Sequence, residues 1–308
     1  MRRAIIATGT FVIFLFGGII GVNAFEENLL GRRLTDWITW RDLPPSFPMN
    51  TPPDSTSGKL SLFILAGQSN MVGRAPPRPE DRTPIPGAWL FGNDYRWHRA
   101  QSPLDTPFRQ VDAVSEDINV GVGPGLFFAE LFRSRVQGRV IGLIPCAKGG
   151  SAITAWQPSR SDTTLYGSCL KRARAASPMG RIEGILFHQG ETDALPKRPS
   201  RNGSINPYRW KSLFSKMAQS WRKDLDSPHL PIVFAQIGSH RGPSSRFPNW
   251  EVVQSQQSAV SLPSVQMVKT SDLPLRDYVH LSREGSRVLG RRMLDSWINL
   301  TAEGTTER

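Results

Sequence analysis

The sequence predicts an α/β protein in which helices cover both faces of a parallel sheet, giving a three-layer α/β/α sandwich. From residue 59 onward, short apolar runs alternate with longer amphipathic stretches. The runs are rich in Ile, Val, Leu and Phe and contain few polar residues, as expected for strands that are buried on both faces. Alternation of strand and helix is typical of a parallel sheet with helices on either side.

The predicted strands are the apolar runs at residues 60–66, 140–144, 182–187, 232–237 and 265–268. The predicted helices are the amphipathic stretches at residues 125–136, 165–176, 208–225, 249–260 and 282–300. Pro124 and Pro207 precede the first and third helices, and proline is common in a first helical turn. The second helix carries basic residues late, which favours a helix C-terminus. Ser282 suits the N-cap of the last helix.

The N-terminal segment predicts export of the chain. Arg2 and Arg3 precede an uncharged apolar stretch at residues 4–22, and a signal peptidase site is expected after Ala24. The stretch is nearly long enough to span a bilayer, so residues 1–24 are either a cleaved signal peptide or a retained signal anchor. In both cases the rest of the chain crosses the membrane. The protein is then secreted, periplasmic, or anchored to the membrane through residues 4–22 with its folded domain outside the cytoplasm.

One folded domain is predicted at residues 59–300. Residues 25–58 are rich in proline and small polar residues and predict an arm or stalk, and residues 301–308 predict a polar tail. With 39% hydrophobic residues, the chain can form a core without depending on disulfides. Cys146 and Cys169 are compatible either with a disulfide, which export would allow, or with two buried thiols.

The formal net charge is +12, and the Lys and Arg residues are spread along the chain. This predicts either a basic soluble surface or attraction to an anionic partner such as an acidic polysaccharide or a membrane face. The sequence contains no zinc-finger, RNP-type or basic heptad pattern, so nucleic acid is not an expected partner.

Ligands bind such sheets beyond the carboxyl ends of the strands, so the loops after the strands are where a site is predicted. The first of these loops holds Ser69 between Gly67 and Gly73. A nucleophilic serine needs an exposed hydroxyl and nearby backbone N–H groups, and this loop can supply both. An ordinary glycine-rich turn would have the same pattern. The loop is not a Gly-x-Ser-x-Gly elbow, because Met71 stands where the second glycine belongs.

The next two loops are also rich in glycine and polar residues. The loop after the second strand contains Gly149 and Gly150, which either bring a backbone N–H close to a ligand oxygen or form a turn without a ligand. The loop after the third strand contains His188, Gln189 and Glu191, and a side-chain amide there can donate to a developing oxyanion. No third ligand lies near His188 and Glu191 in the sequence, so a metal site is not expected.

The last loop contains Asp277 and His280 in an Asp-x-x-His pattern. The carboxylate of Asp277 can accept a hydrogen bond from one ring nitrogen and leave the other nitrogen to face a serine. A surface aspartate and a helix-capping histidine would give the same pattern. Among the five histidines, only His280 has a carboxylate placed to orient it, and His188 is the second choice as a base.

Together, these loops resemble the SGNH hydrolase superfamily and, more narrowly, its sialate O-acetylesterase and acetylxylan esterase branch, carbohydrate esterase family 6. The matching blocks occur in the family's order and span most of residues 59–300. They are Gly67-Gln68-Ser69-Asn70-Met71, Pro145-Cys146-Ala147-Lys148-Gly149-Gly150-Ser151, His188-Gln189-Gly190-Glu191-Thr192-Asp193 and Asp277-Tyr278-Val279-His280-Leu281.

The resemblance implies a flavodoxin-like fold with a five-stranded parallel sheet. It also implies Ser69 as the nucleophile, His280 as the general base and Asp277 as the acid that orients the base. No metal or organic cofactor is expected.

The resemblance further implies an oxyanion hole made by the backbone N–H groups of Ser69 and Gly149 and the side chain of Gln189. The block containing Gln189 departs from the Gly-x-Asn-Asp of the wider superfamily. Glu191 either positions the site or serves as an alternative acid. The site-supporting residues are Gln68, Asn70, Gly150 and Glu191.

The expected activity is removal of O-acetyl groups from a carbohydrate through an acyl-enzyme, with an acetylated carbohydrate as the partner. Three alternatives stay open from the sequence. The first is a non-catalytic carbohydrate-binding or cell-surface module on the same fold. The second is a lipid or thioester hydrolase, and the third is an O-acetyltransferase in which a second sugar replaces water.

Overall fold

The computed structural model of the protein describes residues 58–196 and 203–306. The predicted signal segment at residues 1–24, and the predicted arm apart from Gly58, lie outside these residues. Within them, a seven-stranded sheet has the order β3-β2-β4-β1-β5-β6-β7. All pairs are parallel except β2 with β3, which is antiparallel.

The strands are β1 Leu60–Gly67, β2 Ala88–Phe91, β3 Trp97–Arg99, β4 Val140–Pro145, β5 Gly180–His188, β6 Ile232–Ala235 and β7 Val265–Val268. All five predicted strands are present, but the predicted number of strands was wrong because β2 and β3 extend the sheet at one edge. These two strands are short, and β3 contains two polar residues. Neither therefore shows the long apolar run that marks a strand buried on both faces.

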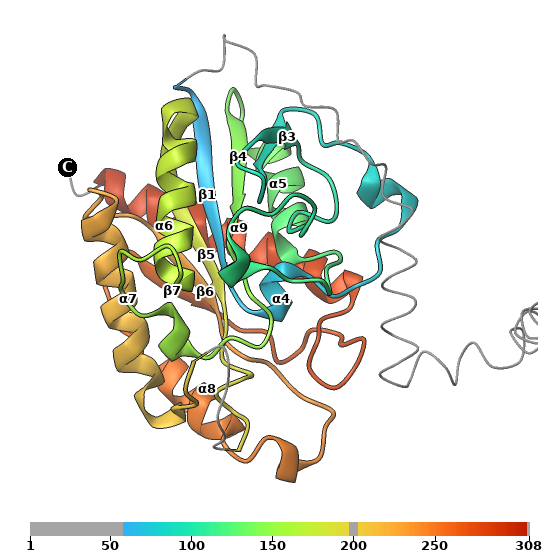
Figure 1. The fold of residues 1–308 in the computed structure, drawn as a ribbon, viewed down its shortest axis with the longest axis vertical. Helices are drawn as coiled ribbons and strands as arrows, with labels where there is room; N and C mark the ends of the chain where they lie inside the picture. Colours follow the sequence, from blue (N-terminus) through green and yellow to red (C-terminus); the bar gives the residue numbers. More distant parts are fainter. Residues whose placement is uncertain (1–57, 197–202, 307–308) are drawn as a thin grey trace, which may run out of the picture. The chain divides into compact units, whose positions relative to one another are not determined.

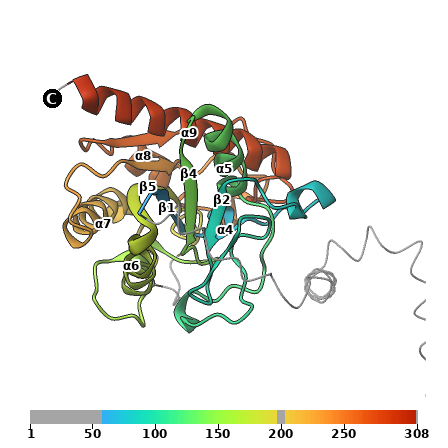
Figure 2. The same cartoon turned by 90° about the horizontal axis from the view of Figure 1, so that it is seen from above.

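The helices are α4 Ser69–Val72, α5 Pro124–Arg135, α6 Leu165–Ala176, α7 Trp210–Asp224, α8 Trp250–Ser258 and α9 Arg283–Thr306. Figure 1 shows the strands side by side in the middle of the fold with helices in front and behind. Viewed from above in Figure 2, α5 and α9 lie on one side of the sheet, and α6 and α7 lie on the other. The three-layer α/β/α prediction is confirmed.

Each face of the sheet has its own hydrophobic core, and the alternation of side chains along β1 contributes to both. Leu62 and Ile64 point into the core shared with α6, α7 and α8. Phe63 and Leu65 point into the core shared with α5 and α9. Successive residues of a strand face opposite sides of a sheet, so a strand that is apolar at every position requires cover on both sides.

The end of the last helix differs from the prediction. We expected the helix to end at residue 300 and a polar tail to follow, but α9 continues to Thr306. The hydroxyl of Thr301 donates to the carbonyl oxygens of Trp297 and Ile298, so this polar side chain is satisfied inside the helix. Polar composition alone was therefore a poor marker of the helix end.

Cys146 and Cys169 form a disulfide, with their Cα atoms 5.4 Å apart. Both side chains are buried. The bond joins the residue directly after β4 to α6, and it decides between the two alternatives that the sequence left open. It also ties the loop that follows β4, where Gly149 and Gly150 lie, to a helix on one face of the sheet.

The long connection between β3 and α5 is held in place by buried Arg172 on α6. Its guanidinium contacts Asp112 Oδ2 and Ser115 Oγ, each at 3.3 Å, and it also donates to Asn93 Oδ1. A buried guanidinium with several acceptors is strongly constrained. This contact fixes the part of the connection that leads to residue 117.

Across residues 58–196 and 203–306, no helix is long and apolar enough to cross a bilayer.

Candidate active site

The four predicted loops meet at one edge of the sheet, where the carboxyl ends of the parallel strands lie. They line a pocket of about 760 Å³ together with part of the connection between β3 and α5. A volume of this size falls in the range of small-molecule sites. Of the predicted site residues, those that line the pocket are Gln68, Ser69, Gly149, Gly150, Glu191 and His280.

Ser69 is the first residue of α4 and is separated from the end of β1 by Gln68 alone. The turn depends on Gly67, which has a φ of +125°. A Cβ at this position would lie 2.1 Å from the carbonyl oxygen of His188 on the neighbouring strand. Only glycine permits this approach, which places the serine at the end of the strand and leaves its hydroxyl at the pocket.

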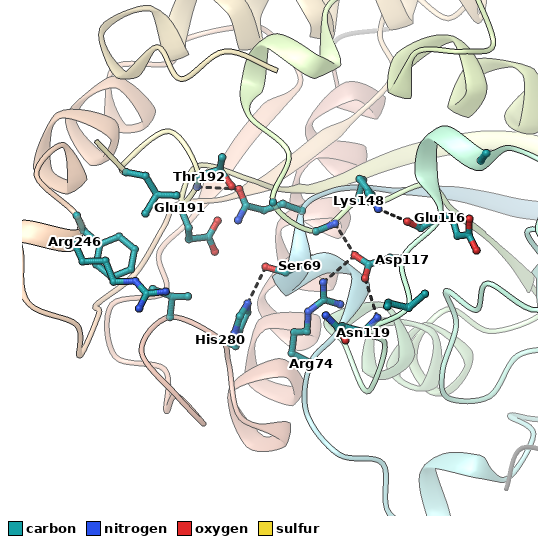
Figure 3. Close-up of a pocket in the computed structure, with 18 residues that line it drawn as sticks. Ser69, Arg74, Glu116, Asp117, Asn119, Lys148, Glu191, Thr192, Arg246 and His280 are labelled. Atoms are coloured by element: carbon teal, nitrogen blue, oxygen red, sulfur yellow. Dashed lines mark hydrogen bonds and ion pairs between the residues drawn. The ribbon is translucent and has the colours of Figure 1, made fainter. Parts of the chain in front are cut away.

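The structure brings Ser69, His280 and Asp277 together from two distant parts of the chain. Nε2 of His280 lies 3.0 Å from Ser69 Oγ, and Nδ1 lies 2.8 Å from Asp277 Oδ2. Figure 3 shows the His280 ring directed at the Ser69 hydroxyl, with the dashed line joining them. With Nδ1 donating to the carboxylate, Nε2 is the unprotonated nitrogen and is able to accept the serine proton.

Asp277 is held in its position by the backbone of its own loop. Its Oδ1 accepts hydrogen bonds from the N–H groups of Val279 at 3.0 Å and His280 at 2.9 Å. Burial by itself raises the pKa of Asp277, but its hydrogen bonds to His280 and Val279 and the charge of His280 outweigh burial and hold the pKa well below its usual range. The Asp277 carboxylate therefore stays ionised and can accept the hydrogen bond from His280 Nδ1.

Gln189 does not lie where an oxyanion donor is needed. Its Nε2 donates to Asp193 Oδ2 at 2.6 Å and to the Ser151 carbonyl at 3.0 Å, while its Oε1 accepts from Trp210 Nε1 at 2.8 Å. The side chain is completely buried and is not among the pocket-lining residues. Its two amide hydrogens are already used, so its contacts do not fit the predicted role.

Gly149 also has a contact that the sequence did not predict. Its backbone N–H donates to Asp117 Oδ2 at 2.7 Å, and Arg74 Nη2 donates to the same oxygen at 2.8 Å. A Cβ on Gly149 would lie within 2.5 Å of both side chains, so a larger residue here would have to displace them. In this structure the predicted oxyanion donor is therefore already paired with a carboxylate.

Gln68 is a polar side chain that contacts the loop containing Gln189. Its Oε1 accepts from the backbone N–H groups of Gly190 and Thr192, each at 3.3 Å, and lies 3.2 Å from Gln189 Nε2. These donors fix which end of the amide is oxygen. The Gln68 Nε2 atom is directed the other way and has no acceptor among the residues that the structure describes.

The sequence did not single out Arg74, Asp117 or Arg246, although all three line the pocket. The Arg246 guanidinium carbon lies 5.6 Å from the ring centroid of Phe247 and 5.3 Å from that of Tyr278. Figure 3 shows Arg246 and Asp117 on opposite sides of Ser69. Arg74 directly follows the loop that contains Ser69, so its position in the sequence is a signal for it. Asp117 and Arg246 lie in irregular connections without a motif, so only the fold brings them to the site.

The part of the chain that the structure describes contains no group of three His, Cys, Asp or Glu side chains that could hold a metal ion. His188 and Glu191 are close to one another, with Nε2 3.5 Å from Oε1, and both side chains are buried. The second choice of base, His188, is thus directed at Glu191, whereas His280 is the histidine in contact with Ser69.

The comparisons with known proteins agree with this architecture. The model of the family described as "Carbohydrate esterase, sialic acid-specific acetylesterase" matches residues 59–299. A probable carbohydrate esterase of Arabidopsis thaliana is 30% identical over 256 residues, covering 77% of this chain and 90% of the relative. The solved structure of that protein has a TM-score of 0.64 at 29% identity and covers 78% of this chain and 98% of its own.

More distant structures share the fold. NanS has a TM-score of 0.58 at 17% identity, with 80% of this chain and 99% of the other covered. A carbohydrate acetylesterase from Xanthomonas citri has a TM-score of 0.56 at 20% identity, with 79% and 57% covered.

The family match over residues 59–299, together with the three-layer α/β/α fold, places the protein in the class of SGNH-type esterases. Within that class, the chain belongs to the carbohydrate esterase family of sialic acid-specific acetylesterases. It is therefore a carboxylic ester hydrolase of the carbohydrate acetylesterase kind.

Proposed function

We propose that the protein removes O-acetyl groups from a carbohydrate by a Ser-His-Asp acyl-enzyme mechanism. The observation that carries the proposal is the 3.0 Å contact between Ser69 Oγ and His280 Nε2, with Asp277 on the other ring nitrogen. Ser69 Oγ attacks the acetyl carbonyl while His280 takes the hydroxyl proton. The sugar oxygen leaves with that proton, and water then attacks the acetyl–serine ester and releases acetate.

For the oxyanion hole, we propose the Ser69 N–H and the Nε2 amide of Gln68 in place of Gln189. The backbone N–H groups of Gly190 and Thr192 anchor the oxygen end of the Gln68 amide, so its nitrogen is held in a fixed orientation at a residue that lines the pocket. A donor that is oriented before the reaction costs no reorganisation when charge develops on the substrate oxygen. The Gly149 N–H would contribute only after exchanging Asp117 for the substrate oxygen.

Replacing Gln68 with Glu is expected to lower kcat by roughly a hundred- to a thousandfold with little change in KM. The new carboxylate retains an acceptor for the Gly190 and Thr192 N–H groups but provides no donor. Initial rates of p-nitrophenyl acetate hydrolysis measure the effect, and Gln256→Glu on α8 is the matched control, since its Oε1 accepts from the Lys211 N–H. A kcat within threefold of wild type would show that another group supplies the donor.

The substrate proposal is tested by comparing acyl chains and sugars. We expect p-nitrophenyl acetate to be hydrolysed much faster than the butyrate and octanoate esters, and free acetate to be released from O-acetylated sialic acid or acetylated xylan. Faster hydrolysis of the longer chains would instead indicate a lipid or thioester hydrolase. Transfer of acetyl to a second sugar without free acetate would indicate a transferase. An enzyme that is inert towards all of these esters would be a binding module.

We also propose that the domain acts outside the cytoplasm, either after secretion or while anchored through residues 4–22. The disulfide between Cys146 and Cys169 supports this location, because such bonds persist in oxidising compartments and are rare in the cytosol. The basic net charge of +12 is compatible with an acidic glycan or an anionic surface in the same compartment.

A further inference from the structure

Asn70, the residue after Ser69, is bonded to the chain on both sides of His280. Its Oδ1 accepts from the backbone N–H of Leu281 at 2.9 Å, and its Nδ2 donates to the carbonyl oxygen of Val279 at 3.1 Å. Its side chain is almost completely buried. One side chain at the nucleophile therefore holds the two backbone groups that flank the base.

Glu191 holds the amide of Asn70 from a third segment. Its Oε1 accepts from Asn70 Nδ2 at 2.5 Å, and it comes from the loop after β5. On its other side lies His188, with Nε2 3.5 Å from the same oxygen. Burial lowers the pKa of His188, although the charge of Glu191 opposes the shift. Hydrogen bonds from an amide to a carboxylate are shorter and stronger than those between neutral groups, which fits the short contact between Asn70 and Glu191.

The contact between His280 and Asp277 cannot by itself place the base against the nucleophile. Those two residues lie three positions apart in one loop, and their hydrogen bonds are internal to that loop. The distance between His280 Nε2 and Ser69 Oγ depends on contacts between the loop and α4. Asn70 makes two of these, and both involve backbone atoms directly next to His280 in the chain.

We propose that Asn70 is a positioning residue that sets the distance between Ser69 Oγ and His280 Nε2, and that Glu191 fixes the orientation of its amide. This inference rests on the proposed mechanism. The side chain must accept from one backbone group and donate to another, and an amide does both. An aspartate has the same shape but would direct a carboxylate oxygen at the Val279 carbonyl and at Glu191.

The test is Asn70→Asp, alone and combined with Glu191→Gln. Asn70→Asp is expected to lower kcat for p-nitrophenyl acetate about a hundredfold or more with KM nearly unchanged, because a displacement of about 1 Å at the reacting atoms has that effect. In the double variant, the glutamine amide can donate to the introduced carboxylate. We therefore expect kcat of the double variant to be at least tenfold higher than kcat of Asn70→Asp alone. Asn299→Asp on the exposed face of α9 makes the same chemical change away from the site and should match wild type.

Two measurements distinguish a loss of positioning from a loss of folding. They are the rate of reaction with a fluorophosphonate and the melting temperature. Asn70→Asp should react with the probe about a hundredfold more slowly while it retains a cooperative melting transition. If it does not fold, Glu191→Ala provides the second test, with an expected fall in kcat of about tenfold at unchanged KM. The inference is overturned if Asn70→Asp stays within threefold of wild type, if the double variant regains nothing, or if Glu191→Ala leaves kcat unchanged. Wild-type protein that neither hydrolyses esters nor reacts with the probe would instead overturn the proposed function.

Discussion

Ser69→Ala is expected to abolish ester hydrolysis, lowering kcat about a million-fold, as loss of the nucleophile does in serine hydrolases. The Ser69 hydroxyl is 3.0 Å from His280 Nε2 and lies at the pocket, where a substrate carbonyl can reach it. Alanine removes the atom that forms the acyl-enzyme and leaves the rest of the pocket unchanged. No other serine is in contact with His280 among the residues that the structure describes.

The free energy of unfolding of Ser69→Ala should differ little from that of the wild-type protein. The lost hydrogen bond contributes only about 1 kcal/mol, and the alanine methyl group stays at the start of α4. Initial rates with p-nitrophenyl acetate and a thermal melt check the two expectations together. Ser239→Ala is the matched control, because its hydroxyl donates to the Ser271 carbonyl in another strand-end loop. Activity of Ser69→Ala within tenfold of wild type would mean that the reaction does not use this serine.

Asp277→Asn is expected to lower kcat about ten-thousand-fold while retaining the shape of the loop. The asparagine oxygen can still accept from the Val279 and His280 N–H groups, which are 3.0 and 2.9 Å from Asp277 Oδ1. Its amide nitrogen would then face His280 Nδ1 and donate to it. The ring would have to carry its proton on Nε2, where it could not accept the proton of Ser69.

This variant also distinguishes between two candidate acids. If Glu191 were the acid that orients the base, Asp277→Asn would retain most of the activity and Glu191→Gln would lose it. We expect the reverse order of effects, because Asp277 is the carboxylate 2.8 Å from His280 Nδ1. Measurement of kcat for both variants decides the question. Asp272→Asn, at a solvent-exposed ion pair with Arg292 beyond β7, is the control and should match wild type.

Most of the fold was predictable because strands buried on both faces have a distinctive sequence pattern. β1 and β4 are nearly continuous apolar runs, β5 is apolar over its second half, and each was located to within two residues of its observed ends. The short strands β2 and β3 were missed, since their pairing with β4 and with each other depends on neighbours rather than on their own residues. The end of α9 was misplaced because polar residues can continue a helix.

The sequence by itself determined the residues that approach one another through local geometry. Ser69 follows a strand at a glycine turn, and Asp277 and His280 lie three positions apart, so their chemistry follows from order and spacing. The tertiary structure decided which polar groups near the site are already hydrogen-bonded within the protein and which can contact a substrate. The Gln189 amide is hydrogen-bonded to Asp193 and Trp210, and the Gly149 N–H donates to Asp117. Asn70 accepts from the backbone N–H next to His280. The physical reason is that each donor has few hydrogens, and partners from distant segments, invisible in sequence spacing, determine where those hydrogens point.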